Sequence, residues 1–554
     1  MRTGWRCAVL GLALGLATPG WADQVDDLRA LRDSTISLVN ALVEQGVLTR
    51  AKADEIIAKA MQAGAAPTPG ATAAATAPKP PAAIAAVPPP AAPPAPGVVR
   101  VPYVPEAVKD EIRDEVKEDV LAQAKTERWG QPNAYPEWLN HFNWYGDIRL
   151  RGQADRYPTD NTPNAPVPVL NEYGVNVTNS TESDNLLRVR ARFGLDATVG
   201  DTVTVGMRLA TGGVGAGTNP GSENQTLGNY ESRSTVGFDR AYIAYRPLSW
   251  LTVSGGRIGD PFYRPTTLVW ADDVSLEGIA LHFEPQFGPH WTLFGTAGAL
   301  PILQNDPSAT SDAKSKWLYA YQLGADWRIS PLASWRLAAA LYDYRNIQGI
   351  PNPNIESDAY NGTAAPFRQT GNTVFDINGL LDTYEGNQSN LLYGVASKFN
   401  EANLSTSLDF ALFGPTHLMI HGDWVRNLGF NQNEILQRTG FLVAKQTTGW
   451  QSQVTIGDPQ MSRKYSWQAT LGYRYVERDA VVDAFTDQNF HLGGTDAKGY
   501  YVSGRFAFET NTYLDLRWFS AKQINGVELA GADAVLSGLP YAVDVLQLDV
   551  NASF

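Results

Sequence analysis

The stretch LQLDVNASF, residues 546–554, alternates strictly between apolar and polar side chains. Successive side chains of a β-strand point to opposite faces, so this segment has one apolar and one polar face. In an outer-membrane β-barrel, the apolar face contacts lipid, the polar face borders a water-filled lumen, and a terminal aromatic such as Phe554 lies in the interfacial girdle. An edge strand of a soluble β-sandwich has the same alternation, so other strands must separate the two folds.

The stretch LRVRARFGLDA, residues 187–197, favours the barrel. Its odd positions are apolar, and its even positions place Arg188, Arg190 and Arg192 on one face. No soluble core strand needs three arginines on one face, whereas a water-filled lumen solvates them. The same alternation recurs in four further segments, at residues 144–151, 203–209, 317–327 and 465–475.

Short turns alternate with long polar excursions over residues 140–554. Turn signals occur near residues 200, 247, 288, 331, 414 and 510, and the excursions include 155–184, 212–236 and 346–389. Outer-membrane barrels combine tight periplasmic turns with longer external loops. The segments number 17 if 390–412 divides at Asn400, and 16 if it is one strand. Because a bacterial barrel has an even number, we expect an all-β transmembrane antiparallel barrel of about 16 strands, with 14 or 18 as alternatives. A barrel of that size encloses an aqueous channel.

The N-terminus predicts export. Arg2 and Arg6 precede an apolar run, and small residues precede Asp23, so residues 1–22 are interpreted as a signal peptide. That run is too short to span a bilayer, and no other apolar stretch reaches membrane-helix length, so a membrane-embedded mature chain must be a barrel. The only cysteine, Cys7, lies in the signal, which excludes disulfides and thiolate sites from the mature chain. The formal net charge of −13 argues against a nucleic-acid partner.

Three segments separate the signal from the barrel, and we place them in the periplasm. Residues 23–62 have helical periodicity and are expected to form a helical hairpin or a short oligomerising coiled coil, although a solvated amphipathic helix is an alternative. Residues 63–104 are rich in Ala and Pro and should form an extended linker. Residues 105–128 are expected to be a charged amphipathic helix that serves as a spacer or a thin assembly seam.

The chain resembles the putative porins of proteobacteria. The resemblance is carried by PEWLNHFNWYGDIRLRG (136–152), RVRARFGLDATVGDTVTVGMRLATG (188–212), ENQTLGN (223–229), the segment 238–281, the final strand, the linker and the leader with QGVLT (45–49). It implies a channel in the outer membrane of a Gram-negative bacterium but no named substrate. At Gly256-Arg257 a glycine-lysine pair is expected, and the replacement keeps the charge.

Six arginines with lumen-facing parity come from three consecutive strands and are expected to form a basic ladder on one wall. They are Arg149, Arg151, Arg188, Arg190, Arg192 and Arg208. The loop 259–274 stands against them with Asp260, Asp272 and Asp273. The arrangement resembles that of general porins, whose third loop folds into the lumen opposite an arginine wall, and such charged rings set ion preference. Alternatively, the arginines only balance lumenal acids such as Asp147 and Asp196. Arg257 has the parity of apolar Leu251 and Val253, so it should lie past a bulge, at a strand end or at the water interface.

The histidines do not suggest a metal site or an enzyme. His417 and His421 lie in a strand pattern about 13 Å apart, too far for one ion. No G-x-S-x-G, P-loop or H-E-x-x-H motif is present, so we expect no catalytic residue, metal or cofactor. The sequence therefore predicts a porin for passive diffusion of small hydrophilic solutes and ions, embedded in outer-membrane lipid as a homo-oligomer such as a trimer. A barrel lipase or protease is one alternative. A structural tether or plug, with the leader binding peptidoglycan or oligomerising, is the other.

Overall fold

The computed structural model describes residues 137–161, 181–215, 217–306, 308–354, 356–379, 392–525 and 541–554. The signal peptide, leader, linker and charged helix expected within residues 1–128 lie outside this part of the chain. Within the described part, no helix has the length and hydropathy needed to cross a membrane.

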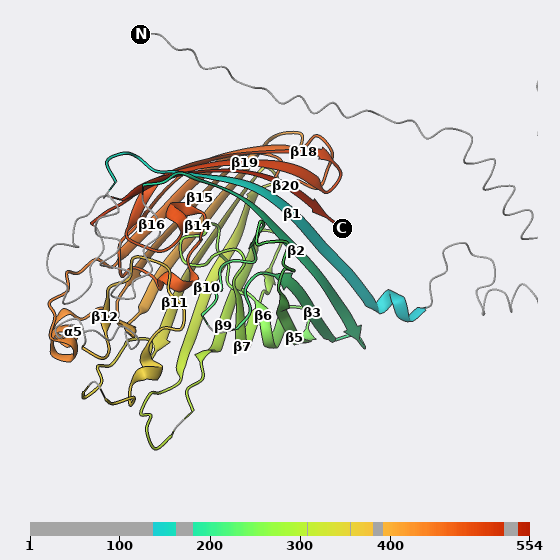
Figure 1. Ribbon diagram of the computed structural model, residues 1–554. Coiled ribbons are helices and arrows are strands. Elements are labelled where there is room, and N and C mark those ends of the chain that lie inside the picture. Colours follow the sequence, from blue (N-terminus) through green and yellow to red (C-terminus); the bar gives the residue numbers. More distant parts are fainter. Residues whose placement is uncertain are drawn as a thin grey trace, which may run out of the picture. The chain divides into compact units, whose positions relative to one another are not determined.

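Sixteen long antiparallel strands form one closed barrel (Figure 1). They are β1 (Phe142–Arg156), β2 (Asp184–Val199), β3 (Val203–Thr211), β5 (Val236–Leu248), β6 (Leu251–Gly259), β7 (Ser275–Phe283), β9 (Trp291–Leu303), β10 (Lys316–Ser330), β11 (Ala333–Arg345), β14 (Asn400–Phe413), β15 (Thr416–Asn427), β16 (Thr448–Gly457), β17 (Trp467–Val476), β18 (Ala497–Glu509), β19 (Thr512–Gln523) and β20 (Ala542–Ser553). Two-residue strands β4 (Gln225–Thr226) and β8 (Gln286–Phe287) extend the same sheet.

The expected count of 16 is confirmed, and the uncertainty at Asn400 has a structural explanation. β14 begins at Asn400, so residues 390–412 are not one strand. The preceding strand β13 (Tyr393–Val395) pairs with β12 (Val374–Asp376) in a separate two-stranded sheet, so it adds no strand to the barrel. The remaining regular elements among the described residues are the helix α5 (Gln432–Thr439) and the 3-10 turns η1 (Glu137–His141), η2 (Asn361–Thr363), η5 (Asp483–Phe485) and η6 (Phe490–Leu492).

The first and last strands close the barrel at a seam between β1 and β20. There Gly146 and Phe554 exchange two backbone hydrogen bonds, with N–O distances of 3.1 and 3.0 Å. A side chain at position 146 would collide with this seam, because a Cβ there would lie 2.5 Å from the ring of Phe554. Glycine at this position therefore lets the terminal aromatic ring lie over β1.

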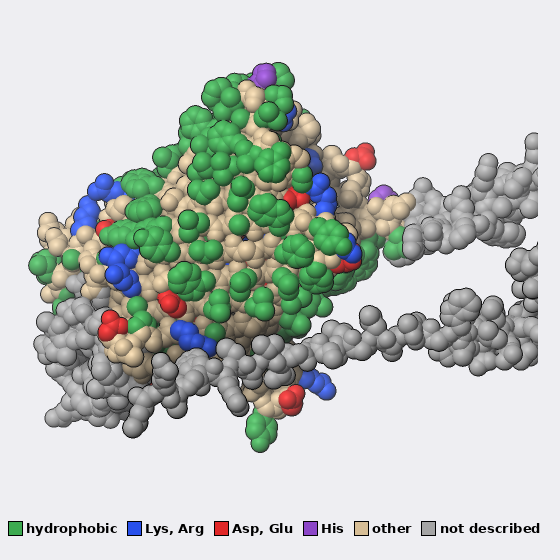
Figure 2. Space-filling view, turned by 90° about the horizontal axis from the view of Figure 1, so that it is seen from above, with side chains coloured by type: hydrophobic (Ala, Val, Ile, Leu, Met, Phe, Trp, Pro, Cys, Tyr) green, Lys and Arg blue, Asp and Glu red, His purple; other side chains and the backbone are tan. Residues whose placement is uncertain are grey.

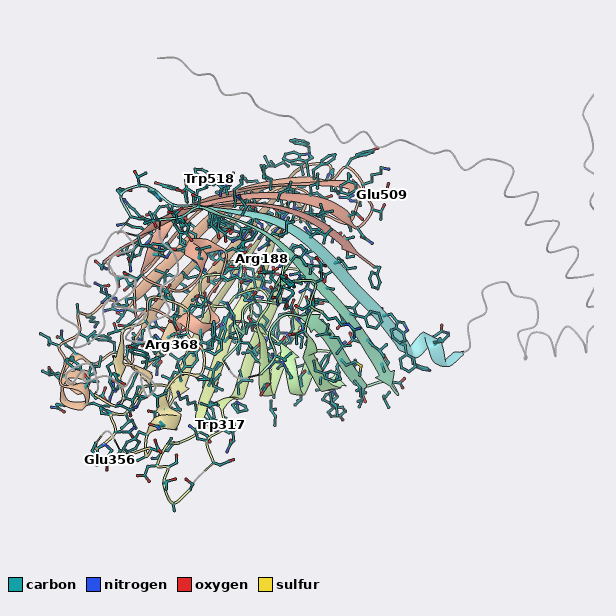
Figure 3. All side chains as sticks on the ribbon, viewed as in Figure 1. Arg188, Trp317, Glu356, Arg368, Glu509 and Trp518 are labelled. Atoms are coloured by element: carbon teal, nitrogen blue, oxygen red, sulfur yellow. The ribbon has the colours of Figure 1, made fainter. Side chains whose placement is uncertain are left out.

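The barrel is apolar outside and polar inside. On β20, Leu548 is 50% exposed, whereas its neighbour Asp549 is 1% exposed. On β19, Trp518 is exposed on the outer face. Figure 3 labels Trp518 and also Arg188 of β2, which belongs to the inner face. Figure 2 shows hydrophobic side chains spread across the outer surface of the strands. This reversal of the usual soluble pattern is what a strand between lipid and water requires.

Aromatic rings gather at the short-turn end of β9, β10 and β11. Trp291 stacks on Trp327 with ring centroids 5.1 Å apart, and Trp327 lies 6.5 Å from Trp335. Indole rings have an apolar body and a polar tip, so they suit the boundary between lipid and water. The cluster therefore marks one interfacial girdle.

Two loops fill part of the interior. The loop between β6 and β7, residues 260–274 and called L3 below, carries Trp270, which is only 1% exposed. Its ring packs 5.5 Å from that of Tyr342 on β11 and 5.4 Å from that of Phe485 in the β17–β18 loop. A barrel of this size is too wide for strand side chains alone to fill. The loops therefore build an apolar cluster inside it, and the lumen is not an open cylinder.

Candidate functional site

The six arginines singled out in the sequence all lie on the inner face of neighbouring strands. Arg149 and Arg151 on β1 stand directly opposite Arg190 and Arg188 on β2, respectively. Arg192 follows on β2, and Arg208 stands on β3. We call these six residues the arginine wall. Their burial inside a polar lumen reflects the period of the strands, since adjacent outer-face residues such as Leu150 are exposed.

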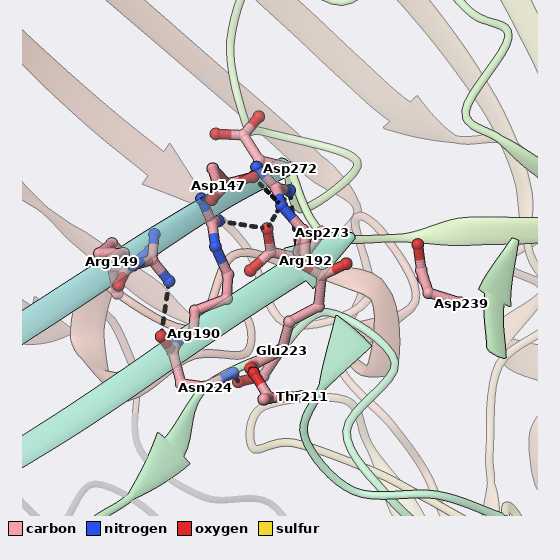
Figure 4. A network of polar contacts seen from close by, with 12 residues as sticks. Asp147, Arg149, Arg190, Arg192, Thr211, Glu223, Asn224, Asp239, Asp272 and Asp273 are labelled. Carbon is pink, nitrogen blue, oxygen red and sulfur yellow. Dashed lines mark hydrogen bonds and ion pairs between the residues drawn. The ribbon is translucent and has the colours of Figure 1, made fainter. Parts of the chain in front are cut away.

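The centre of the arginine wall is tied together by ion pairs (Figure 4). Arg190 lies 2.8 Å from Asp147 and 3.0 Å from Asp273. Arg192 lies 2.5 Å from Asp147, 3.3 Å from Glu223 and 3.7 Å from Asp273. Asp147 belongs to β1, Asp273 to L3 and Glu223 to the β3–β5 loop. Two guanidinium groups thus join two inward-folded loops to the barrel wall.

Glu223 extends this network towards β3 and β5. It lies 2.8 Å from Arg208, which also donates to Asp239 at 2.6 Å. The loop is fixed locally because the Thr211 hydroxyl donates to the Glu223 carbonyl at 2.9 Å. Burial raises the pKa of the Glu223 carboxyl to about 7, with repulsion from Asp273 adding to the shift while the guanidinium groups oppose it. This carboxyl is therefore poised to change charge near neutral pH.

The part of the arginine wall formed by Arg149, Arg151 and Arg188 has fewer close carboxylates. Arg151 forms two hydrogen bonds to Asp549 of β20, at 2.7 and 2.8 Å. Arg149 donates to the side-chain oxygen of Asn224 at 2.5 Å, and its closest carboxylate, Asp549, is 4.0 Å away. Within the described part of the chain, no carboxylate lies within 4.0 Å of Arg188. Asp155 and Asp184 attract Arg188 from farther away, so this end of the arginine wall has fewer close ion pairs than its centre.

The three acids of L3 have different surroundings. Asp273 contacts the arginine wall, as described above. Asp260 is buried and lies 2.8 Å from Arg264 of the same loop, so it stabilises the turn of L3. Asp272 is 77% exposed and lies 2.7 Å from Arg264. Of the three, only Asp273 is brought against the arginines that the sequence placed opposite them.

Three further residues of the network were not recognised from the sequence. They are Glu223, Asn224 and Asp239. Each lies within a segment that carries the resemblance to porins, namely ENQTLGN and 238–281. The resemblance to porins could therefore have drawn attention to these polar residues. The alternation of side chains could not have placed them in the lumen.

Arg257 stays on the outer face, two residues before β6 ends. Its guanidinium lies 2.7 Å from Glu277, its register partner on β7. It also donates to the carbonyl of Asp239 at 2.8 Å, where the pairing of β3 with β5 shifts register. The sequence placed Arg257 past a bulge, at a strand end or at the water interface, and the structure places it near the end of β6.

The histidines are separated as expected. His417 lies 2.7 Å from Asp409, and His421 is four residues farther along β15. In the part of the chain that the structure describes, no three His, Cys, Asp or Glu side chains are grouped so that they could hold a metal ion.

Three solved structures illustrate what this chain is similar to. The outer membrane channel DcaP of Acinetobacter baumannii is 11% identical with a TM-score of 0.37, covering 74% of this chain and 97% of that chain. OprB of Pseudomonas putida is 11% identical with a TM-score of 0.42, covering 77% and 97%. OmpT of Vibrio cholerae is 9% identical with a TM-score of 0.37, covering 74% and 99%.

Among curated proteins, no sequence matches this chain. The family model of the putative porins matches residues 32–554, which is nearly the whole chain and includes every strand of the barrel. The chain therefore belongs to the putative porin family, and its sixteen-stranded barrel is that of an outer-membrane channel.

Proposed function

We propose that the barrel passes small hydrophilic solutes and ions down their gradients, without covalent chemistry, and that the arginine wall gives anions an advantage at the narrow part of the lumen. The field close to a permeating ion, and not the net charge of the chain, governs its passage. An arginine wall can therefore favour anions in an acidic protein.

The observation that carries this proposal is the excess of guanidinium groups around Arg149 and Arg188. Three of the arginines, Arg190, Arg192 and Arg208, are paired with four carboxylates, so their positive charge is balanced. The carboxylates are those of Asp147, Asp273, Glu223 and Asp239. Arg188 has no carboxylate within 4.0 Å among the described residues, where Asp155 and Asp184 attract it only from farther away, and the closest carboxylate to Arg149 is 4.0 Å away. Guanidinium groups without a close ion pair are the ones available to attract anions from the solution.

The rival explanation is that the arginines only balance lumenal acids. Asp147 does pair with Arg190 and Arg192, which agrees with that explanation for the centre of the arginine wall. It gives no close ion pair for Arg188, because Asp155 and Asp184 act on this side chain only from beyond 4.0 Å. Charge balance alone predicts that replacing Arg188 leaves ion selectivity unchanged.

Planar-bilayer recording of the reconstituted full chain tests the proposal. In a KCl gradient, the reversal potential should indicate chloride preference, and Arg188→Gln should reduce it. Arg463→Gln is the matched control, because Arg463 is an exposed arginine in the turn between β16 and β17, paired 2.7 Å from Asp458. A barrel that inserts but never conducts would contradict the channel function and favour the tether or plug.

We also infer that the barrel assembles as a homo-oligomer in the lipid. Support comes from the pair Arg257–Glu277, whose side chains are 35% and 56% exposed near the ends of β6 and β7 and are therefore available for polar contacts with a neighbouring subunit. Chemical crosslinking in native membranes tests this, with Arg257→Leu and Glu277→Leu combined as the variant. A monomer in membranes before any substitution would refute the inference.

A further inference from the structure

A second charged region lies beside the arginine wall, and the two regions meet at Asp549 of β20, which pairs with both Arg151 and Arg517. A cavity of about 260 Å³ is bounded by the inner faces of β15 to β19, by the tip of L3 and by the β17–β18 loop. Four guanidinium groups and two carboxylates line it, which leaves an excess of positive charge. They belong to Arg264, Arg474, Arg505, Arg517, Asp272 and Asp487.

Arg474 is the arginine of this cavity that lacks a close ion pair. Its side chain, on β17, is only 2% exposed, and within the described residues no carboxylate lies within 4.0 Å of it. It donates to the carbonyl of Thr267 in L3, and its guanidinium lies 5.3 Å from the ring centroid of Phe490. Its Nε has no hydrogen-bond partner. A buried, unpaired charge is costly, so an anion bound here would be favoured.

The other three arginines of the cavity already have carboxylate partners. Arg505 and Arg517 lie 3.1 and 3.5 Å from Asp515, and Arg517 also pairs with Asp549. Arg264 lies between Asp260 and Asp272, as described for L3. Asp487 accepts a hydrogen bond from the neutral side-chain amide of Asn489 at 2.6 Å and attracts Arg474 from beyond 4.0 Å. Arg474 is therefore the arginine of this cavity that is available to bind an anion.

Neutral hydrogen-bonding groups cover the wall next to Arg474. Gln451 donates to the Tyr501 hydroxyl at 2.9 Å, and that hydroxyl donates to Gln453 at 2.5 Å. The hydroxyls of Thr455 and Thr470 lie 2.9 Å apart. The side-chain oxygen of Gln451 is buried and has no donor. Amides and hydroxyls in this arrangement complement the hydroxyl groups of a solute.

We propose that this cavity binds a small hydroxylated carboxylate, with its carboxylate on Arg474 and its hydroxyls on the glutamine and threonine wall of β16 and β17. Guanidinium groups match carboxylates in charge and in donor geometry. The cavity volume lies just below the roughly 300–1,000 Å³ of most ligand pockets, so the occupant is a small solute. The inference rests on the proposed channel function, because the lumen is the route to the site.

Three six-carbon probes test the ligand class on the unmodified chain. Gluconate carries a carboxylate and hydroxyls, hexanoate only the carboxylate, and sorbitol only hydroxyls. Gluconate should interrupt the chloride current of reconstituted channels at lower concentration than either analogue. Equal block by gluconate and hexanoate would overturn the hydroxyl recognition, and equal block by gluconate and sorbitol would overturn the anion site.

A matched pair of arginine variants tests the residue. Arg474→Gln should weaken gluconate binding about tenfold, the low end for a hydrogen-bonded charge, and Arg474→Lys should restore part of it. Arg336→Gln is the control, because Arg336 also lies in the interior, over the rings of Tyr263 and Phe294, but does not line the cavity. If Arg474→Gln and Arg336→Gln weaken gluconate binding equally, the effect comes from the overall positive charge of the interior and not from this cavity. That result would overturn the assignment.

Titration calorimetry on the folded, detergent-solubilised chain separates this inference from the channel function. If the chain binds gluconate through Arg474 but does not conduct, the channel function is refuted and the binding site is supported. A conducting channel without measurable gluconate binding would refute the site and keep the channel. If Arg474→Gln does not fold, the three probes on the unmodified chain decide.

Discussion

Replacing Arg190 and Arg192 together with Gln is the most informative change to the arginine wall. Both side chains contact Asp147 and Asp273, so the double variant removes two positive charges and leaves these carboxylates without their partners. The local charge becomes more negative. We expect the channel to shift from chloride towards potassium.

The size of the shift follows from Coulomb's law. At on the order of 7 Å in water, one guanidinium changes the energy of a permeating ion by about 0.6 kcal/mol. Losing two positive charges raises the energy of a permeating anion and lowers that of a cation. The difference between these two energies therefore changes by about 2 kcal/mol at 10 mM salt, where the Debye length is about 30 Å. That is on the order of 20-fold in the permeability ratio. At 1 M salt, where the Debye length is about 3 Å, little of it should remain.

Reversal potentials measured at both salt concentrations provide the assay. Asp272→Asn with Asp273→Asn should move the potential the other way, and Arg463→Gln serves as the control outside the lumen. Heat-modifiable migration on gels must show that each variant is folded. A change of less than twofold at 10 mM in both double variants would refute the constriction and leave charge balance as the role of these residues.

Three further changes test other parts of the molecule. Lowering the pH from 8 to 6 should protonate Glu223, whose pKa burial raises to about 7; the loss of its negative charge should increase chloride preference in reversal-potential measurements, and Glu223→Gln should abolish that pH dependence. Trp270→Ala should remove the main anchor of L3 at a cost of about 3–5 kcal/mol, and limited proteolysis should then cut L3 faster than in the unmodified chain. Deleting residues 23–128 should leave a barrel that folds and conducts, as gel mobility and bilayer recordings can show, while complete loss of folding would place the domain boundary elsewhere.

The strands could be predicted because their side chains repeat with a period of two. Leu187 to Ala197 revealed the inner and outer faces of β2, and the even-number rule corrected the count at Asn400. Arg474 could have been found in the same way. It stands between Tyr473 and Tyr475, which were recognised as one apolar face, so its own parity pointed to the lumen.

The contacts of the loops could not be predicted, since irregular backbone has no period. Asp272 and Asp273 are adjacent in the sequence, yet one binds Arg264 and the other binds Arg190. Which of them reaches the arginine wall depends on how Trp270 packs, and that packing involves residues of β11 and the β17–β18 loop. Distant packing therefore decides a charge contact that local sequence leaves open.

The seam between β1 and β20 has a consequence for how the protein folds. Arg151 and Asp549, which meet there, are 398 residues apart. Bringing the ends of so long a loop together costs about 5 kcal/mol of chain entropy before any seam contact forms. Until then, both strands expose unpaired backbone groups that can pair with other chains. Closure is therefore expected to be a late and slow step, during which the unfinished barrel is most prone to aggregate.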